Sequence, residues 1–247
     1  MRFALIGYPV AHSLSPQLFS AAYGGRYPYD LLEYEDFEPA WQAFLERYDG
    51  INVTAPFKLD AFARVTQLSA AARESGAVNL VVKTPSGLVG HNSDVDGVLG
   101  AVGEGHYADT LVVGTGGAAR AALTAARRMG GQIYVAGRSA HKVQELSEHF
   151  GAQGLGFSEA ARLRPALVIY TLPGVVPVPE GLNFAESTVL EAEYRHPSLA
   201  GLPCKAYLSG LQWLMWQAAA GYQTLTGEKP DIQNLTYYVT EQSHAHR

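Results

Sequence analysis

Short apolar runs alternate with stretches of helical periodicity along the chain, which is typical of an α/β fold with largely parallel sheets. In the first part we expect strands at Arg2–Gly7, Tyr29–Tyr34, Gly50–Val53 and Ala77–Val82 and one ending near Gly90, with helices at Pro16–Ala22, Pro39–Tyr48, Phe57–Arg64 and Ser69–Glu74. In the second part we expect strands at Thr110–Val113, Gln132–Ala136, Ala166–Thr171 and Thr188–Glu191, with helices at Ala118–Met129 and His141–Phe150.

A long apolar stretch, Leu208–Leu225, follows the second series, and we expect it to be a helix that belongs with the first domain. The sequence therefore predicts two domains, of which the first is discontinuous. We place the first domain at residues 1–94 plus 205–247 and the second at 95–204. The linker between them is expected near Asp94–Tyr107.

Composition excludes several classes of protein. The 247 residues are 47% hydrophobic and 17% charged, which is a soluble globular balance. A net charge of −5 argues against binding driven by nucleic-acid phosphates. The single cysteine, Cys204, cannot form an internal disulfide. Without an 18-residue apolar run or a signal-peptide pattern at the N-terminus, the chain is expected to be cytoplasmic.

A glycine-rich turn is the first motif that carries chemistry. The segment Gly114, Thr115, Gly116, Gly117 and Ala118 follows an expected strand and opens an expected helix. The first glycine permits a tight turn, the second lets the backbone approach a pyrophosphate, and the helix N-terminus supplies N–H donors. This spacing predicts a Rossmann-type dinucleotide site.

The next expected strand indicates which dinucleotide binds there. Sites for NAD place an acidic residue about 20 positions after the glycine loop, to hold the ribose 2′-hydroxyl. Here the strand runs into Arg138 and Ser139, with Lys142 one turn later. Two cations suit a 2′-phosphate, which favours NADP over NAD. The alternative is that Ser139 only caps a helix and both cations are solvated.

Two serines precede the first expected helix. Ser13 and Ser15, together with the N–H groups of the helix, would form a neutral cradle for a carboxylate. Ser15 followed by Pro16 is also an ordinary start of a helix, so a purely structural role stays open.

A second polar cluster follows the third expected strand. Asn52, Thr54 and Lys58 lie close together, and Lys58 falls in the first turn of an expected helix, where the helix dipole disfavours a cation. Asp94 follows a later strand and would be either a helix cap or the carboxylate that orients Lys58.

In this order the motifs resemble the shikimate dehydrogenase family over nearly the whole chain. The resemblance implies that Lys58 and Asp94 are the catalytic pair. It implies a substrate-binding set of Ser13, Ser15, Asn52, Thr54, Asn79, Tyr194 and Gln217. It implies a cofactor-binding set of Gly114, Thr115, Gly116, Gly117, Ala118, Arg138, Ser139, Lys142, Thr171 and Gly210.

The resemblance also implies the fold and the reaction. We expect an N-terminal α/β substrate-binding domain with a mainly parallel sheet, a Rossmann-type NADP-binding domain, and an active site in the cleft between them. The expected reaction is the NADPH-dependent reversible reduction of 3-dehydroshikimate to shikimate, in the pathway to chorismate and the aromatic amino acids. We expect a small-molecule substrate and a monomer or homodimer, with no nucleic acid, membrane or metal as partner.

Departures from the family pattern leave alternatives open. Leu80, Gly137, Glu191 and Trp213 each replace a residue that is usual in the family. One alternative is a quinate/shikimate dehydrogenase, or a related enzyme with another substrate or with NAD. Another is a non-catalytic metabolite sensor, against which the retention of both Lys58 and Asp94 argues.

Overall fold

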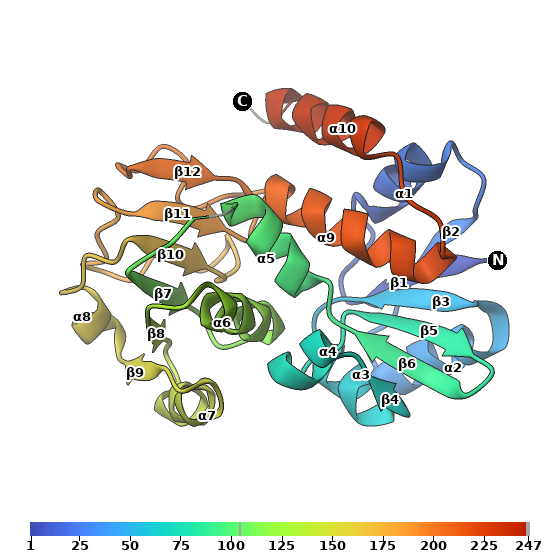
Figure 1. The fold of residues 1–247 in the computed structure, drawn as a ribbon, viewed down its shortest axis with the longest axis horizontal. Helices are drawn as coiled ribbons and strands as arrows, with labels where there is room; N and C mark the ends of the chain where they lie inside the picture. The colour runs from blue at the N-terminus through green and yellow to red at the C-terminus, as the bar shows by residue number, and fades with distance from the viewer. Residues whose placement is uncertain (104, 246–247) are drawn as a thin grey trace. The chain divides into compact units, whose positions relative to one another are not determined.

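The computed structural model describes residues 1–103 and 105–245, and the chain forms two compact units (Figure 1). Unit 1 comprises Met1–Gly97 and Met215–Arg247, and unit 2 comprises Val98–Leu214. The chain leaves unit 1 inside helix α5 (Asp94–Val102) and returns inside helix α9 (Gly210–Thr226). The predicted boundaries lie earlier in the chain, at the start of α5 and ahead of α9.

Unit 1 is built on a six-stranded sheet with the order β2-β1-β3-β5-β6-β4. β1 pairs in parallel with both β2 and β3, whereas β5 is antiparallel to β3 and to β6. The sheet is therefore mixed: β2, β1 and β3 run parallel, β5 and β6 form an antiparallel hairpin, and the edge strand β4 pairs in parallel with β6. Its strands are β1 (Phe3–Gly7), β2 (Tyr29–Glu33), β3 (Gly50–Val53), β4 (Gln67–Leu68), β5 (Leu80–Thr84) and β6 (Gly87–His91).

Helices cover both faces of this sheet. Alternate residues of β1 point to opposite faces, so Ala4 and Ile6 join a core with Trp41 and Phe44 of α2. On the opposite face, Phe3 packs against Phe19 of α1. Helix α10 lies against α1 (Figure 1). Besides α5 and α9, the helices of this unit are α1 (Ser15–Tyr23), α2 (Phe37–Arg47), α3 (Lys58–Arg64), α4 (Ala70–Ser75) and α10 (Ile232–Ala245).

Unit 2 contains a second six-stranded sheet, with the order β12-β11-β10-β7-β8-β9 and parallel pairing throughout. This is the doubly wound order of a dinucleotide-binding fold, which reverses between its first and fourth strands, here β7 and β10. The strands are β7 (Asp109–Val113), β8 (Gln132–Ala136), β9 (Gln153–Leu155), β10 (Leu167–Tyr170), β11 (Thr188–Glu191) and β12 (Ala206–Leu208).

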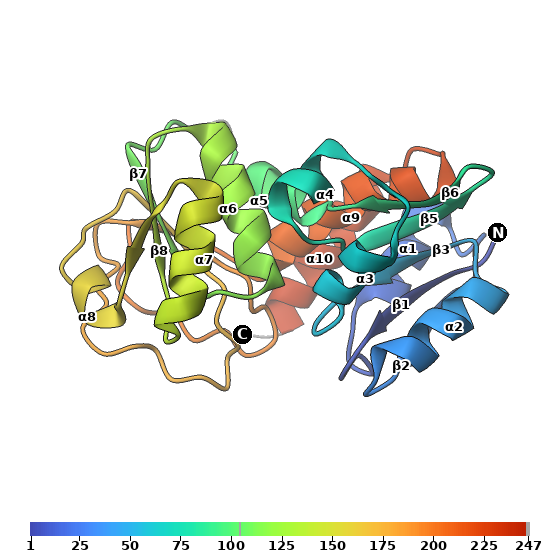
Figure 2. The same cartoon turned by 90° about the horizontal axis from the view of Figure 1, so that it is seen from below.

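The helices of unit 2 follow the pattern of alternating strand and helix. Helix α6 (Gly117–Met129) packs on β7 and β8, and α7 (Ala140–Phe150) packs on β8 and β9. Figure 2 shows the two helices side by side, as their mutual contacts require. The short helix α8 (Phe157–Ala160) contributes Ala160 to a core beneath the sheet. The predicted α/β class, with largely parallel sheets and a Rossmann-type domain, is confirmed.

The structure adds detail to two sequence predictions about the joining segments. The chain passes from unit 1 to unit 2 within the expected linker near Asp94–Tyr107, and most of that linker is helix α5, because full burial of Val95 and Val98 outweighs the poor helix propensity of Gly97 and Gly100. The expected helix Leu208–Leu225 begins only at Gly210, since residues 206–208 pair with β11 as the edge strand β12. Within the part of the chain that the structure describes, every helix is too short or too polar to span a bilayer.

Candidate functional site

Sheet pairing in unit 1 gathers polar residues at one edge. β1 and β3 are parallel neighbours, so their carboxyl ends lie at the same edge of the sheet. The loop after β1 carries Ser13 and Ser15, and the segment after β3 carries Thr54 and Lys58. Because β5 runs antiparallel to β3, Asn79 lies just before its start, at that same edge.

The hairpin partner of β5 completes the cluster. β6 runs antiparallel to β5 and ends at His91, so Asn92, Ser93 and Asp94 also lie at this edge. The Asn92 side chain accepts a hydrogen bond from the Asp94 backbone N–H at 3.2 Å and donates one to Ser75 Oγ at 2.9 Å. These bonds fix the backbone that presents Asp94.

Two largely buried charged side chains at this edge form an ion pair. Lys58 Nζ donates to Asp94 Oδ2 at 2.6 Å, and the two side chains are only 14% and 12% exposed. Lys58 is the first residue of α3 and Asp94 is the first residue of α5. A helix N-terminus repels an ammonium and stabilises a carboxylate, so the Asp94 charge offsets the unfavourable position of Lys58. The structure thus brings together the two residues predicted as a catalytic pair.

A buried amide network adjoins this ion pair. Asn79 Oδ1 accepts from the Ser93 backbone N–H at 2.8 Å, and Asn79 Nδ2 donates to Ser93 Oγ at 3.1 Å. Gln217 Oε1 accepts from Asn79 Nδ2 at 3.4 Å and from Ser93 Oγ at 3.3 Å. Helix α9 approaches closely because Gly221 has no side chain: a Cβ there would lie 2.8 Å from Ser93 Oγ. The network can present hydroxyl and amide groups to a polyhydroxylated ligand.

The two predicted serines lie near two tyrosines, the half-buried Tyr29 and the buried Tyr222. Ser13 Oγ donates to Ser15 Oγ at 3.0 Å, and the Tyr222 hydroxyl donates to the Ser15 carbonyl at 3.3 Å. The Tyr29 hydroxyl donates to Asn52 Oδ1 at 2.8 Å. Burial raises the pKa of Tyr29, while a hydrogen bond with Ser15 opposes that rise. A phenol that stays protonated links the serine pair to the Asn52 side chain.

A carboxylate supports the loop that carries the serines. Glu33 Oε2 accepts from the backbone N–H groups of Val10 at 2.6 Å and Ala11 at 2.7 Å. The Ala11 and Val10 hydrogen bonds lower the pKa of Glu33. The Val10 carbonyl in turn accepts from the Ser13 N–H at 2.8 Å, so Glu33 fixes the start of the turn that ends at Ser13.

Sequence reasoning missed four residues of this site: Tyr29, Glu33, Ser93 and Tyr222. Tyr29 and Tyr222 read as core aromatics, and no local pattern distinguishes a tyrosine whose hydroxyl meets a serine far away in the sequence. Ser93 did carry a signal, because it lies between two residues of the Asn92–Asp94 motif.

The predicted dinucleotide site of unit 2 lies where the strand order reverses. Gly114 follows β7 and Thr171 follows β10, and these strands are parallel neighbours. Thr171 Oγ1 donates to the Val113 carbonyl at 2.8 Å. Gly114 has φ +122°, and a Cβ there would collide with Thr171 Oγ1, so only glycine fits. Ligands of doubly wound sheets bind at such a reversal.

The glycine loop leaves room for a phosphate. Gly116 precedes α6, and a Cβ built on it would meet no atom within 4 Å. The first turn of α6 contains no acidic residue, so its N–H groups and dipole favour an anion. The space at Gly116 and the helix N-terminus therefore fit the pyrophosphate of a dinucleotide.

The segment after β8 offers the two expected cations. Arg138 and Lys142 are exposed, and Ser139 Oγ accepts from the Lys142 backbone N–H at 3.4 Å. Ser139 therefore caps the helix, as the alternative interpretation of the sequence expected. The side chains of Arg138 and Lys142 stay accessible to an anion. Gly137 is required here, because a Cβ would lie 2.6 Å from the Thr115 methyl group.

Two predicted residues lie elsewhere in unit 2. Tyr194 is in the loop after β11 and belongs to a different unit from the other predicted substrate residues. Gly210 is the first residue of α9, where a Cβ would meet the carbonyls of Glu191 and Ala192. Among the described residues, no three His, Cys, Asp or Glu side chains are placed to hold a metal ion.

Comparisons with known proteins agree with this arrangement. A family model described as the shikimate dehydrogenase substrate binding domain matches residues 5–81. The shikimate dehydrogenase (NADP(+)) of Thermus thermophilus is 32% identical over 95% of this chain and 96% of its own length. That of Exiguobacterium sibiricum is 33% identical over 94% and 95%.

A solved structure extends the likeness to three dimensions. The crystal structure of shikimate 5-dehydrogenase from Thermus thermophilus, in complex with NADP(H) and shikimate, has a TM-score of 0.84 at 28% identity. The match covers 98% of this chain and 99% of that one. With near-complete relatives above 30% identity and the same arrangement of strands and helices, this chain belongs to the shikimate dehydrogenase family.

Proposed function

We propose that this protein is an NADP-dependent shikimate dehydrogenase, which interconverts 3-dehydroshikimate and shikimate. The observation that carries the proposal is the largely buried Lys58–Asp94 pair at the sheet edge that also carries the serines and amides. Relatives over nearly the full chain are named shikimate dehydrogenase (NADP(+)), which supports the same reaction and cofactor.

Unit 1 supplies the groups that hold the substrate. Ser13 and Ser15 donate hydroxyl hydrogen bonds to the substrate carboxylate, which needs donors and tolerates neutral ones. Asn52, Thr54, Asn79 and Gln217 bind the ring hydroxyls, because amides and hydroxyls both donate and accept. We assign Tyr194 of unit 2 to the same substrate set.

Lys58 supplies the proton, and Asp94 positions Lys58. Reduction of the C3 ketone creates a negative charge on its oxygen, and the Lys58 ammonium donates a proton to that atom. Asp94 holds the ammonium in place through a charge-assisted hydrogen bond. The two groups share a hydrogen bond of 2.6 Å, so a change in either one alters the position of the other.

Unit 2 supplies the groups that hold NADP. The backbone of Gly114, Thr115, Gly116, Gly117 and Ala118 surrounds the pyrophosphate, and Arg138, Ser139 and Lys142 bind the 2′-phosphate. Thr171 and Gly210 complete the cofactor set. When bound, NADPH supplies the hydride. Direct contact between donor and acceptor carbon is a chemical requirement of hydride transfer, so the reaction needs both units.

A crossed assay tests the proposal. Purified protein is given shikimate or quinate with NADP⁺ or NAD⁺, and nicotinamide reduction is followed by absorbance. We expect the highest kcat/KM with shikimate and NADP⁺. A preference for quinate or for NAD⁺ would establish the alternative enzyme, and no turnover with any pair would indicate a sensor.

The variant Lys58→Met tests the catalytic assignment. Loss of the proton donor is expected to lower kcat by about 10²-fold or more, while shikimate affinity changes little. Lys205→Met, at an exposed lysine, is the matched control and should retain kcat. Unchanged kcat in Lys58→Met would remove Lys58 from the catalytic step.

A further inference from the structure

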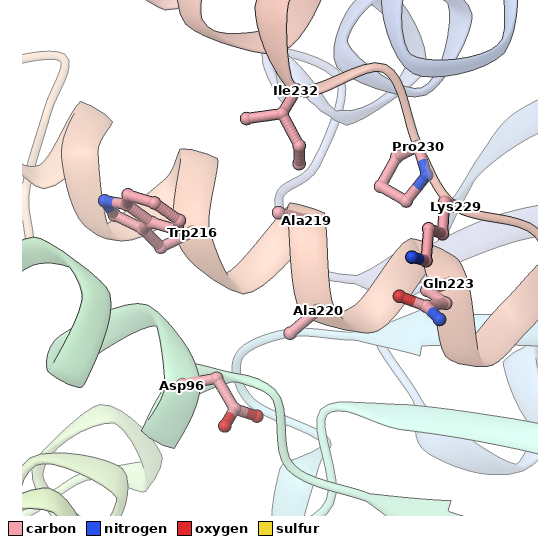
Figure 3. A pocket seen from close by; sticks show the side chains of 8 residues that line it. All are labelled: Asp96, Trp216, Ala219, Ala220, Gln223, Lys229, Pro230 and Ile232. Atoms are coloured by element: carbon pink, nitrogen blue, oxygen red, sulfur yellow. The ribbon is translucent and has the colours of Figure 1, made fainter.

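Unit 1 contains a pocket that none of the proposed substrate or cofactor residues lines. It has a volume of about 320 Å³ and lies among α9, the first turn of α5 and the segment leading into α10 (Figure 3). Its lining residues are Asp96, Trp216, Ala219, Ala220, Gln223, Lys229, Pro230 and Ile232. This volume is at the lower end of the range for small-molecule sites.

One stripe of α9 forms the apolar floor. Trp216, Ala219, Ala220 and Gln223 recur at the spacing that places side chains on one helix face. The two alanines leave a flat surface between larger neighbours. Trp216 and Ile232 stand at its margin and are 39% and 41% exposed, which is costly for such large apolar side chains. A flat aromatic ring would cover the alanines and contact the Trp216 indole.

The polar groups of the pocket carry opposite charges. Figure 3 shows Lys229 and Gln223 together at one end, Trp216 at the other, and Asp96 across the floor from Ile232. Within the described part of the chain, no hydrogen bond or ion pair engages the Lys229 ammonium. A ligand with one anionic and one cationic group could pair with Lys229 and Asp96 together.

We propose that this pocket binds a free α-amino acid with an aromatic side chain. The ring lies over Ala219 and Ala220 against Trp216, the carboxylate binds Lys229, and the ammonium binds Asp96. An aromatic acid without an ammonium group would engage Lys229 alone, and an aromatic amine would engage Asp96 alone, so each is the poorer ligand.

The position of the pocket predicts an effect on substrate binding, a consequence that rests on the proposed function. Asp96 lies in the same turn of α5 as Asp94, and Trp216 directly precedes Gln217 on α9. A ligand held between these helices favours one arrangement of the elements that carry both residues. We therefore expect bound amino acid to change the KM for shikimate.

Calorimetric titration of the full chain with L-phenylalanine tests binding independently of activity. We expect saturable binding, and binding about tenfold weaker or worse for hydrocinnamate, which lacks the ammonium, for phenethylamine, which lacks the carboxylate, and for L-alanine, which lacks the ring. No saturable binding of L-phenylalanine, or equal binding of hydrocinnamate, would overturn the proposal.

Two variants locate the site. Trp216→Ala and Lys229→Met, both at exposed side chains, should weaken L-phenylalanine binding about tenfold with unchanged melting temperature. Lys205→Met is again the control. Equal binding by all three variants would place the ligand elsewhere. L-phenylalanine binding that leaves the KM for shikimate unchanged would refute the coupling. If the wild-type protein binds L-phenylalanine but does not turn over shikimate with either cofactor, only the proposed function is refuted.

Discussion

Glu33 shows how one side chain can control a substrate site that it does not enter. Its carboxylate accepts from two consecutive backbone N–H groups, those of Val10 and Ala11. The loop held in this way leads directly to Ser13 and Ser15. We regard Glu33 as a positioning residue: it fixes the serine hydroxyls through the backbone.

The variant Glu33→Gln tests this role. An amide oxygen is a weaker acceptor than a carboxylate, so we expect the shikimate KM to rise about fivefold while kcat stays within about twofold. Glu46→Gln removes one charge at an exposed site and is the control. The same rise in KM in both variants would point to a general effect of charge.

The lowered pKa of Glu33 gives this prediction a pH dependence. A carboxylate whose pKa is lower in the fold stabilises it at pH values above its ordinary pKa of about 4.3, and that contribution disappears as the pH falls through the lowered value. Urea unfolding should therefore show the largest stability gap between wild type and Glu33→Gln near neutral pH. The gap should close in acid; a constant gap would contradict the assignment.

Residues differ in how far their neighbours in sequence reveal their role. Lys58 was predictable because an ammonium in the first turn of a helix is a local conflict, and such conflicts mark functional sites. Tyr29 offers no such conflict, since a tyrosine in a half-buried strand is ordinary. Its role rests on contacts with Ser15 and Asn52 that only the folded chain creates.

At the scale of elements, Lys83 joins a strand to a helix. Lys83 of β5 donates from Nζ to the Leu45 carbonyl at 2.7 Å, and its ammonium lies 5.1 Å from the centre of the Phe44 ring. Leu45 lies in the last turn of α2, where backbone carbonyls lack partners within the helix. Burial lowers the pKa of Lys83, and the hydrogen bond offsets part of that cost.

The variant Lys83→Met should destabilise the protein, because it leaves the Leu45 carbonyl without its donor. We expect a loss of about 1 kcal/mol in the free energy of unfolding, measured by urea denaturation. Lys83→Arg keeps a donor and should lose less. If Lys83→Met is as stable as wild type, water must replace the ammonium at no cost.

Which elements the sequence predicted depends on what stabilises them. β3, β8 and β11 were predicted to the residue, because each is a compact apolar run with a clear end. Helix α5 was not predicted, since its glycines have poor helix propensity and the burial of Val95 and Val98 that favours it is a tertiary effect. β12 has just three residues, and its pairing with β11 cannot be inferred from its composition.

At the scale of the molecule, the proposed function assigns the two ligands to different units. The polar edge of unit 1 collects residues from both ends of the chain, because α9 returns to it with Gln217 and Tyr222. The sequence predicted this discontinuity from the position of one apolar stretch. It predicted a Rossmann-type dinucleotide site in unit 2 from the glycine loop, and the structure places that loop where the strand order reverses.

Hydrogen exchange with each ligand alone tests this division of labour. A ligand that binds only the folded state slows local opening by mass action, by about 100-fold at a concentration 100 times its Kd. We expect shikimate to protect residues 8–16, 52–58 and 79–94 of unit 1, and NADP⁺ to protect residues 114–118 and 138–142 of unit 2, as measured by mass spectrometry.

Lys58→Met should retain shikimate protection, because it removes a proton donor and leaves the serines intact, whereas Ser13→Ala with Ser15→Ala should lose it. Shikimate protection confined to residues 114–142 would reverse the assignment of ligands to units, since no residue of the carboxylate cradle lies there.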